Sequence, residues 1–276
     1  MCAQTKWKYI KDRLDFTQTT RLFFEQYESR YVQVYSILLE KKVGDFYSLV
    51  LMEQDTCIGF AYYDGKQTLY ISDIRLSTIP DLAKQIALMN WSYTRLAASA
   101  SVAESFLLLA GHAYSLEMNQ FVFSCSKLNL PPEGGGSLVH ASSKDFQIAY
   151  RMFEGFFVDC WPETPIPKHL SKLLENEMEK NNIFFWKDVE GALVAMAAKV
   201  RTTTNTASIS WVYTLKEYRG RGFGSKVTAF LTQRLLRQGY RECNLFTDAS
   251  NPISNHVYIK IGYIEVGQQS VYAVQN

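Results

Sequence analysis

The chain has 276 residues, a length that suits two domains better than one hydrophobic core. Apolar residues make up 47% of it, which excludes a disordered protein, and a formal charge of +2 argues against a protein that mainly grips nucleic acid or an anionic membrane. The five cysteines show no metal-ligand or redox spacing, and no apolar run approaches the roughly 20 residues of a membrane helix. We therefore expect a cytoplasmic protein with reduced thiols, which partners neither nucleic acid nor membrane.

The first half of the chain predicts helices at both ends of a group of short strands. Hairpin signals stand at Glu53–Asp55 and at Asp64–Gly65, between apolar runs. The predicted elements, in chain order, are a helical region at 15–39, strands at 46–52, 57–63 and 68–71, helices at 82–89 and 102–116, and a strand at 121–125.

A Pro-Pro-Glu-Gly-Gly-Gly-Ser stretch at 131–137 is the clearest break in the chain. Prolines followed by glycines are typical of a turn-rich, flexible connection. We therefore predict two domains, 1–130 and 143–276, joined by a linker at 131–142.

The second half repeats the general order of the first. Asn251 and Pro252 are typical of a helix cap and a first-turn proline, and Gly239 and Gly262 are typical stop signals. The predicted elements are helices at 145–160 and 170–179, strands at 182–186, 193–200 and 208–214, a helix from 222, a strand at 243–246, a helix from 251, and strands at 263–266 and 271–274. The shared order favours a duplicated fold, although residue identity between the halves is too low to establish a repeat.

The most informative segment is 218–225, Tyr-Arg-Gly-Arg-Gly-Phe-Gly-Ser, which follows an apolar run and opens an amphipathic helix pattern. Amides at a helix start lack intrahelical partners and attract anions. Glycines let a ligand approach the backbone closely, and arginine adds donors suited to phosphate. The segment therefore predicts a cradle for a diphosphate group, although by itself it also fits a plain turn into a helix.

A second motif lies downstream. Arg219, Gly222 and Gly224 form an Arg-x-x-Gly-x-Gly pattern, and the stretch from Asn251 to Tyr263 follows as Asn-x-x-Ser-x-x-x-Tyr-x-x-x-Gly-Tyr. With these two motifs in this order, the second half resembles the GNAT superfamily of acyl-coenzyme-A-dependent N-acyltransferases. The whole chain is similar to bacterial two-domain members, in which a degenerate copy precedes an intact one.

The resemblance implies an α/β (α+β) chain with a tandem GNAT fold, in which mixed, mostly antiparallel sheets are flanked by helices. It also implies acetyl-coenzyme A (acetyl-CoA) as co-substrate, with its diphosphate on the cradle and a backbone amide near Val212 polarising the thioester carbonyl. The cofactor-binding residues so implied are Val212, Tyr213, Thr214, Arg219, Gly220, Arg221, Gly222, Phe223, Gly224, Ser225, Asn251 and Ser254. The side chains of Val212, Tyr213 and Thr214 are also compatible with an ordinary core strand. Asn251 is also compatible with a helix cap.

The resemblance implies Tyr258 as the acid that protonates the departing thiolate. A half-buried aromatic on an amphipathic helix is the plainer interpretation. The base stays open, because the strand at 208–214 carries no carboxylate: Glu154, Asp159 or a water relay are the alternatives. The four histidines show no ligand spacing, so we predict no metal.

From these observations we expect an N-acetyltransferase that transfers acetyl from acetyl-CoA to a primary amine of a small molecule by direct attack. Two alternatives stay open: an acyl-CoA-binding sensor or scaffold without turnover, and an acyltransferase that uses longer acyl donors. We expect coenzyme A in the second half only, because the first half has no Arg-x-x-Gly-x-Gly match. The protein could be a monomer or a homodimer.

Overall fold

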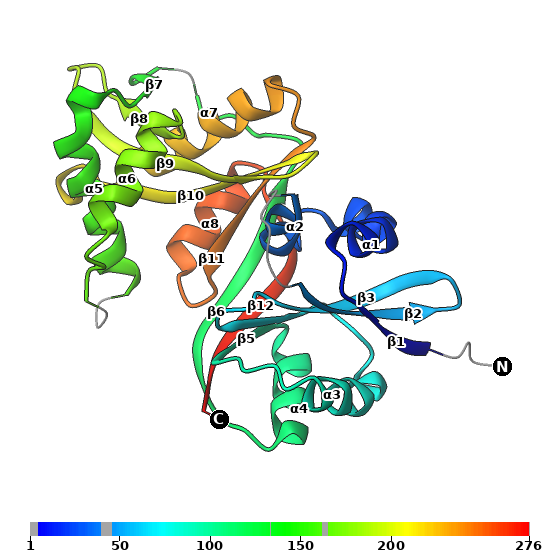
Figure 1. The fold of residues 1–276 in the computed structure, drawn as a ribbon. Coiled ribbons are helices and arrows are strands. Elements are labelled where there is room, and N and C mark those ends of the chain that lie inside the picture. The colour runs from blue at the N-terminus through cyan, green and yellow to red at the C-terminus, as the bar shows by residue number, and fades with distance from the viewer. Residues whose placement is uncertain (1–4, 40–45, 133, 162–164, 276) are drawn as a thin grey trace. The chain divides into compact units, whose positions relative to one another are not determined.

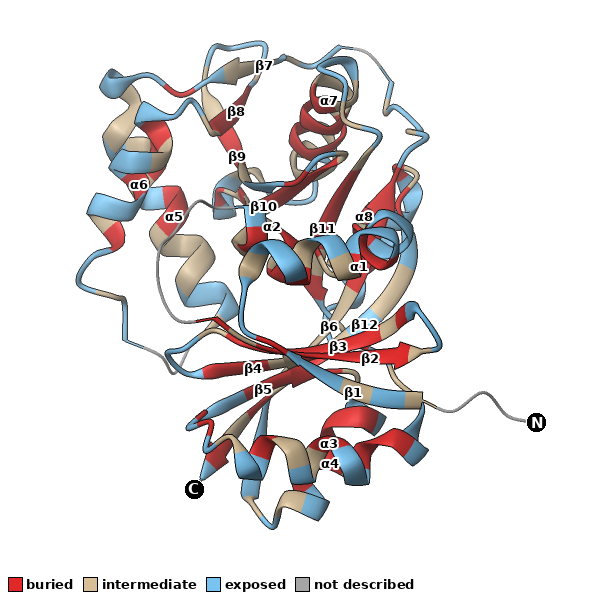
Figure 2. Ribbon diagram, turned by 45° about the vertical axis from the view of Figure 1, so that its right-hand side comes forward, coloured by how far each residue is buried: buried red, intermediate tan, exposed pale blue. Residues whose placement is uncertain are grey.

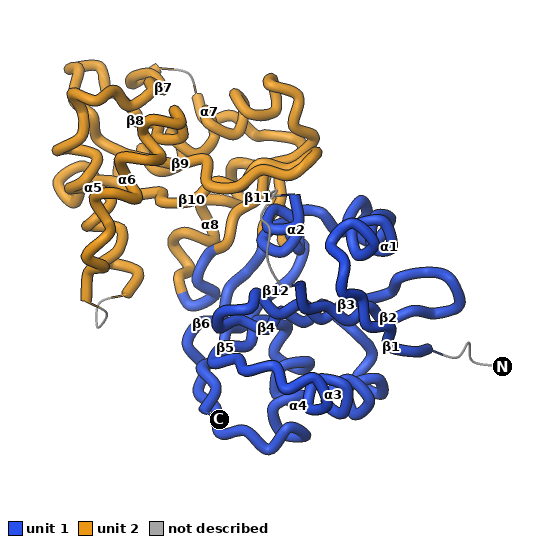
Figure 3. The backbone as a smooth tube through the Cα atoms, in the orientation of Figure 1, with its two compact units in different colours: residues 1–122, 247–250, 266–276 blue, residues 123–246, 251–265 orange. Residues whose placement is uncertain are grey.

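The computed structural model describes residues 5–39, 46–132, 134–161 and 165–275. The chain forms two compact units (Figure 3). Unit 1 comprises residues 1–122, 247–250 and 266–276, and unit 2 comprises residues 123–246 and 251–265. Each unit therefore takes segments from both halves of the sequence.

Unit 1 contains the elements of the first half (Figure 1). They are β1 (Thr5–Ile10), α1 (Arg13–Tyr27), α2 (Val32–Leu39), β2 (Tyr47–Glu53), β3 (Thr56–Tyr63), β4 (Thr68–Ile71), the 3₁₀ helix η1 (Leu76–Thr78), α3 (Ile79–Leu88), β5 (Arg95–Ala98), α4 (Ala100–Ala110) and the larger part of β6 (Ala113–Cys125). The strand order begins β1-β2-β3-β4-β5, antiparallel except for the parallel pair β4–β5.

Unit 2 repeats this sequence of elements. They are β7 (Ser137–His140), the 3₁₀ helix η2 (Ser143–Asp145), α5 (Phe146–Cys160), α6 (Leu170–Glu179), β8 (Ile183–Lys187), β9 (Leu193–Thr202), β10 (Thr206–Thr214), the 3₁₀ helix η3 (Lys216–Tyr218), α7 (Phe223–Arg237), β11 (Glu242–Asp248), α8 (Pro252–Lys260) and the start of β12 (Ile264–Gln275). Its strands are ordered β7-β8-β9-β10-β11, and again only the fourth and fifth pair in parallel.

The last strand of each half departs from this repetition. From residue 266 onward β12 belongs to unit 1, where Ser270–Ala273 pair antiparallel with β5. In the same way, the end of β6, residues 123–125, belongs to unit 2. The predicted domain of residues 143–276 therefore differs from unit 2 at its carboxyl end, and the domain boundaries themselves stay a prediction.

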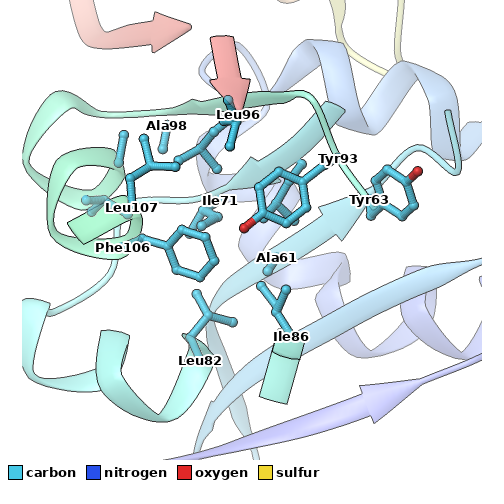
Figure 4. Close-up of a cluster of buried hydrophobic side chains, with 14 of the residues drawn as sticks. Ala61, Tyr63, Ile71, Leu82, Ile86, Tyr93, Leu96, Ala98, Phe106 and Leu107 are labelled. Atoms are coloured by element: carbon cyan, nitrogen blue, oxygen red, sulfur yellow. The ribbon is translucent and has the colours of Figure 1, made fainter. Parts of the chain in front are cut away.

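Alternation along β3 explains how unit 1 buries both faces of its sheet. Phe60 and Tyr62 pack against α1 and α2, whereas Ala61 and Tyr63 face α3 and α4, because successive side chains of a strand point to opposite faces. Burial colouring shows β2 and β3 as largely buried strands (Figure 2). The core between the sheet and α3 and α4 includes Phe106, whose ring points into the cluster in Figure 4.

Unit 2 is layered in the same way (Figure 1). On β8, Ile183 and Phe185 join the core beneath α5 and α6. The intervening Trp186 contacts Phe230 of α7 on the opposite face, at 5.0 Å between ring centroids. The sheet therefore separates α5 and α6 from α7, and β10, which precedes α7 in the chain, lies within this sheet.

Helix boundaries in unit 2 follow the predicted signals. The Asn251 side chain caps α8 by accepting from the Ser254 amide at 3.1 Å, and a proline occupies the first turn. Gly239 and Gly262 follow the ends of α7 and α8 with φ of 104° and 102°, in the region that favours glycine. The predicted helix stops are confirmed.

Several predicted elements of the first half need correction. The helical region at 15–39 is two helices, α1 and α2, and the helix predicted at 102–116 ends at Ala110, because left-handed Gly111 closes it and β6 starts at Ala113. Strands β1 and β5 were not predicted: β5 has four residues and no alternation, whereas β1 does alternate, with Trp7 between Lys6 and Lys8. At the carboxyl end, the two strands predicted at 263–266 and 271–274 form one strand, β12.

The Pro-Gly stretch is bound to unit 2 instead of forming a free connection. The carbonyl oxygen of Gly134 accepts from Lys226 Nζ at 2.8 Å, and that of Gly135 accepts from Trp186 Nε1 at 3.0 Å. Residues 137–140 form β7 and pair with β8. Positive φ at 134–136 lets the glycines make this turn. Glu133 lies outside the described residues.

Candidate functional site

The strand that leads to the cradle separates from its parallel neighbour. β10 pairs with β11 at Thr206–Ser208 only, within the described chain, and its remaining residues up to Thr214 extend beyond the last paired position. The result is a fork between the two strands. On this side, the backbone groups of the second half of β10 have no strand partner, so they are open to a ligand.

A β-bulge interrupts the other side of β10. The register with β9 passes from Ser210↔Ala198 to Tyr213↔Met196, so that Trp211 and Val212 together oppose one residue. Trp211 has a φ of 53°, which is unusual for a bulky residue, and its ring packs on Phe153 of α5 at 4.2 Å. The bulge therefore re-aims the backbone at Val212, where the carbonyl-polarising amide is predicted.

The cradle lies between η3 and α7. Gly220 and Gly222 have φ values of 79° and 76°, and an added Cβ would find no atom within 4 Å at either position. Gly222 is the N-cap of α7 and the first turn of this helix carries no acidic residue. Amides 220–225 donate no hydrogen bond to the described part of the chain, so they present an open row of donors.

Side chains around the cradle point in several directions. Arg221 is exposed and its guanidinium lies 5.7 Å from the Tyr218 ring centroid, while Phe223 and Ser225 are half-buried. The ring of Tyr213 contacts α5, since an added Cβ on Gly155 would lie 2.5 Å from it. Burial, and after it Asp159, raises the pKa of the Tyr213 phenol.

Arg219 turns toward α5. Its Nη2 donates to Asp159 Oδ2 at 2.5 Å and its Nε to the Thr214 carbonyl at 3.1 Å. One of the two carboxylates considered as a base is therefore engaged by an arginine of the cradle. The other, Glu154, lies half-buried on the same helix.

Tyr258 and Tyr263 differ in what their hydroxyl groups contact. The Tyr263 hydroxyl shares a hydrogen bond with Thr232 at 2.7 Å, whereas the Tyr258 hydroxyl has no partner within the described chain, although only 8% of the residue is exposed. Burial, and after it the Cys160 thiol, raises the pKa of Tyr258 above its ordinary 10.0. Tyr258 therefore keeps its proton at neutral pH and has it available for a bound molecule.

All predicted site residues fall in unit 2. The strand residues at 212–214 precede η3 and the cradle in the chain, and α7, which starts from the cradle, contacts α8. Asn251 is exposed and Ser254 half-buried at the start of α8, with the Asn251 side-chain oxygen occupied by its capping bond. The contact with coenzyme A predicted for these two residues stays a prediction.

The residues present fit a thioester carrier with a diphosphate. Open amides at a helix start suit the phosphates, and the fork leaves unpaired backbone for an amide-containing arm. Two features escaped sequence reasoning: the bulge at Trp211, which carries no glycine signal, and the pairing of Asp159 with Arg219. Among the described residues, no group of three or more His, Cys, Asp or Glu side chains is placed to hold a metal. No helix in the described ranges combines the length and apolarity needed to cross a membrane.

Comparison with known proteins agrees with this geometry. The acetyltransferase (GNAT) family matches residues 146–263. An acetyltransferase from the GNAT family of Colwellia psychrerythraea has 16% identity and a TM-score of 0.58, over 98% of this chain and all of that chain. A GCN5-related N-acetyltransferase from Sphaerobacter thermophilus has 14% identity and a TM-score of 0.62, over 98% and 95% of the two chains. No curated protein matches the sequence.

Residues 146–263 match the GNAT family, and the two solved structures show that the chain shares the GNAT fold. Its fold is α/β, with the GNAT order of elements present twice. The family match over residues 146–263 indicates acyltransferase activity.

Proposed function

We propose that unit 2 is an N-acetyltransferase that transfers the acetyl group of acetyl-CoA directly to a primary amine of a small molecule. One observation carries the proposal: the fork between β10 and β11 is followed in the chain, after the short helix η3, by the open amides 220–225. A chain with this backbone offers donors to a carbonyl and to a diphosphate along a single path.

Each part of the site has a defined task in this reaction. The amides of the cradle hold the diphosphate, and the amide at Val212 donates to the thioester oxygen, where negative charge develops. Acetyl-CoA supplies the activated acyl group. The amine nitrogen bonds to the acyl carbon while the bond from this carbon to sulfur breaks.

Proton movements complete the balance. The phenol of Tyr258, which is protonated at neutral pH, donates its proton to the departing sulfur. The amine loses its proton to water, since the Asp159 carboxylate is bound by Arg219. Glu154 is the remaining carboxylate of α5 that could accept a proton through water.

A thiol-release screen tests the proposal. Purified protein is mixed with acetyl-CoA and a panel of primary amines, and free thiol is measured against the variant Gly222→Val. This variant puts a β-branched side chain at a φ of 76°, which costs about 1–3 kcal/mol and distorts the cradle. We expect thiol release with at least one amine for the wild type and none for the variant.

The alternatives give different results in the same screen. Binding of coenzyme A without thiol release for any amine would favour a sensor or scaffold. Faster release from longer acyl donors than from acetyl-CoA would identify a longer-chain acyltransferase. Absence of coenzyme A binding by calorimetry would overturn the proposal altogether.

A further inference from the structure

The cradle loop has few contacts of its own. Gly220, Arg221 and Gly222 are exposed, and open space surrounds both glycines. At its carboxyl end the loop is continuous with α7, where the Lys226 amide donates to the Gly222 carbonyl at 3.1 Å. At the other end it depends on Arg219, because a loop of flexible glycines does not fix its own conformation.

Arg219 joins three parts of unit 2. Its guanidinium donates to the Thr214 carbonyl at the end of β10 and to Asp159 near the end of α5, and it lies 5.1 Å from the centroid of the Tyr213 ring. These contacts use the side chain's fork of donors in one orientation. The guanidinium therefore connects the cradle to the strand and to the helix on the opposite face of the sheet.

A second ion pair also connects α5 to the segment before the cradle, but its side chains are more exposed than those of the Arg219–Asp159 pair. Arg151 of α5 contacts Glu217 of η3 at 3.0 Å, with side chains 61% and 48% exposed. The Arg219–Asp159 side chains are less exposed, at 45% and 35%. Arg151 has no bond to a strand carbonyl among the described contacts. Exposed single contacts of this kind hold their elements weakly.

We propose that Arg219 and Asp159 are positioning residues, which hold the open amides 220–225 where the diphosphate binds. The inference rests on the proposed function. In this role Asp159 contributes to the affinity for acetyl-CoA and does not deprotonate the amine. Arg219 then acts through the backbone that it holds, since its bonded donors point to Thr214 and Asp159.

The variant Asp159→Asn tests the assignment, because it keeps the side chain's volume and removes its charge. We expect the Kd for coenzyme A, measured by calorimetry, and the KM for acetyl-CoA to rise about 5–10-fold, by loss of a charge-assisted bond. At saturating donor, kcat and the KM for the amine should stay within about two-fold of wild type, since the chemistry is untouched. Asp159→Glu, which can restore the ion pair, should recover most of the affinity.

Two controls make the result decisive. Glu217→Gln breaks the neighbouring ion pair and should leave the Kd for coenzyme A unchanged, whereas Arg219→Lys, which cannot bond Thr214 and Asp159 together, should raise it as Asp159→Asn does. A fall in kcat with an unchanged Kd in Asp159→Asn would overturn the inference and make Asp159 the base. Wild-type protein that fails to bind coenzyme A would overturn the proposed function instead.

Discussion

The helix after the fourth strand begins differently in the two units. In unit 2, α7 starts Phe223-Gly224-Ser225, after a left-handed glycine and with open amides. In unit 1, α3 starts Ile79-Pro80-Asp81 directly after η1. There the amide of Ile79 is bonded to the Leu76 carbonyl, the proline has no amide hydrogen, and the acid adds negative charge. The start of α7 thus has open amides and no acid, whereas the start of α3 has an acid and a proline, although both occupy the same place in the repeated order.

The ends of the parallel strand pairs, β4–β5 in unit 1 and β10–β11 in unit 2, also differ. Ends of β4 and β5 in unit 1 line a cavity of about 30 Å³, which is room for water only. Arg30 and Asp73 also line it and form an ion pair, and the Arg30 side chain is 13% exposed. In unit 1 the Arg30–Asp73 ion pair thus lies at the end of the parallel strand pair, where unit 2 has the fork. The two units share one order of elements, and the open amides at the start of α7 are found in unit 2.

The helices that follow the fifth strand of each unit, α4 and α8, can be compared in the same way. This comparison gives the largest expected effect on activity. Tyr258 is the seventh residue of α8, and Phe106 is the seventh of α4, buried in the core of unit 1. Tyr258→Phe therefore makes α8 resemble α4. We expect kcat to fall about 10²–10⁴-fold, because the leaving sulfur loses its acid, with the Kd for coenzyme A unchanged. Steady-state kinetics and calorimetry measure both. Unaltered kcat would remove Tyr258 as the acid.

Removing the guanidinium of Arg30 should lower the stability of unit 1. Arg30 Nη1 and Nη2 donate to the carbonyls of Val266 and Gln268 at 3.3 and 3.1 Å, within unit 1. Arg30→Met leaves these carbonyls and Asp73 without the guanidinium, so we expect the free energy of unfolding to fall by about 2 kcal/mol in chemical denaturation.

A surface arginine provides the control for this loss. Arg21 pairs with Glu25 at 3.2 Å within α1, and its side chain is 64% exposed. Arg21→Met should therefore change the free energy of unfolding by less than about 0.5 kcal/mol. Equal losses in the free energy of unfolding in both variants would show that the buried contacts of Arg30 do not stabilise unit 1.

Local signals made the glycine turn at 220–222 and the helix caps predictable from sequence. Glycines at 220 and 222 mark positive φ, and Asn251 marks a helix start, because both preferences act over a few residues. The bulge at Trp211 gave no such signal, since tryptophan is unusual at a φ of 53° and surrounding packing imposes that conformation.

Contacts between distant residues were not predictable in the same way. Asp159 and Arg219 stand 60 residues apart, and nothing in the local pattern selects one carboxylate of α5 over another. The transfer of β12 to unit 1 is also a matter of strand pairing, which periodicity does not specify. The fold class and the glycine positions of the loop at 220–222 were therefore accessible from sequence, whereas the pairing of β12 with β5 was not.

Placing an aspartate in the first turn of α7, as in α3, tests the comparison of the two helix starts. Ser225 and Asp81 are each the third residue of their helix, so Ser225→Asp gives α7 the charge that unit 1 carries. We expect the Kd for coenzyme A to rise about tenfold, through repulsion of the diphosphate, while the helix itself gains slightly from the acid near its start. Ser225→Asn is the neutral control, which removes the hydroxyl without adding charge, and it should weaken binding less than Ser225→Asp does. Equal binding by both variants would mean that the diphosphate does not lie at this helix start.

The smallest expected effect concerns alkaline pH and a buried thiol in each unit. Burial raises the pKa of Cys57 in unit 1 and of Cys125 in unit 2 to about 11, from an ordinary 9.0. Because the folded state holds these protons more tightly than the unfolded state, their stabilisation is complete below pH 9.0 and is lost as pH rises toward 11. Between pH 8 and 10, each thiol should lower the free energy of unfolding by about 1 kcal/mol. Cys57→Ala and Cys125→Ala should each flatten this dependence in denaturation series at the two pH values, and an unchanged slope would show that the thiol ionises as readily in the folded unit as in the unfolded chain.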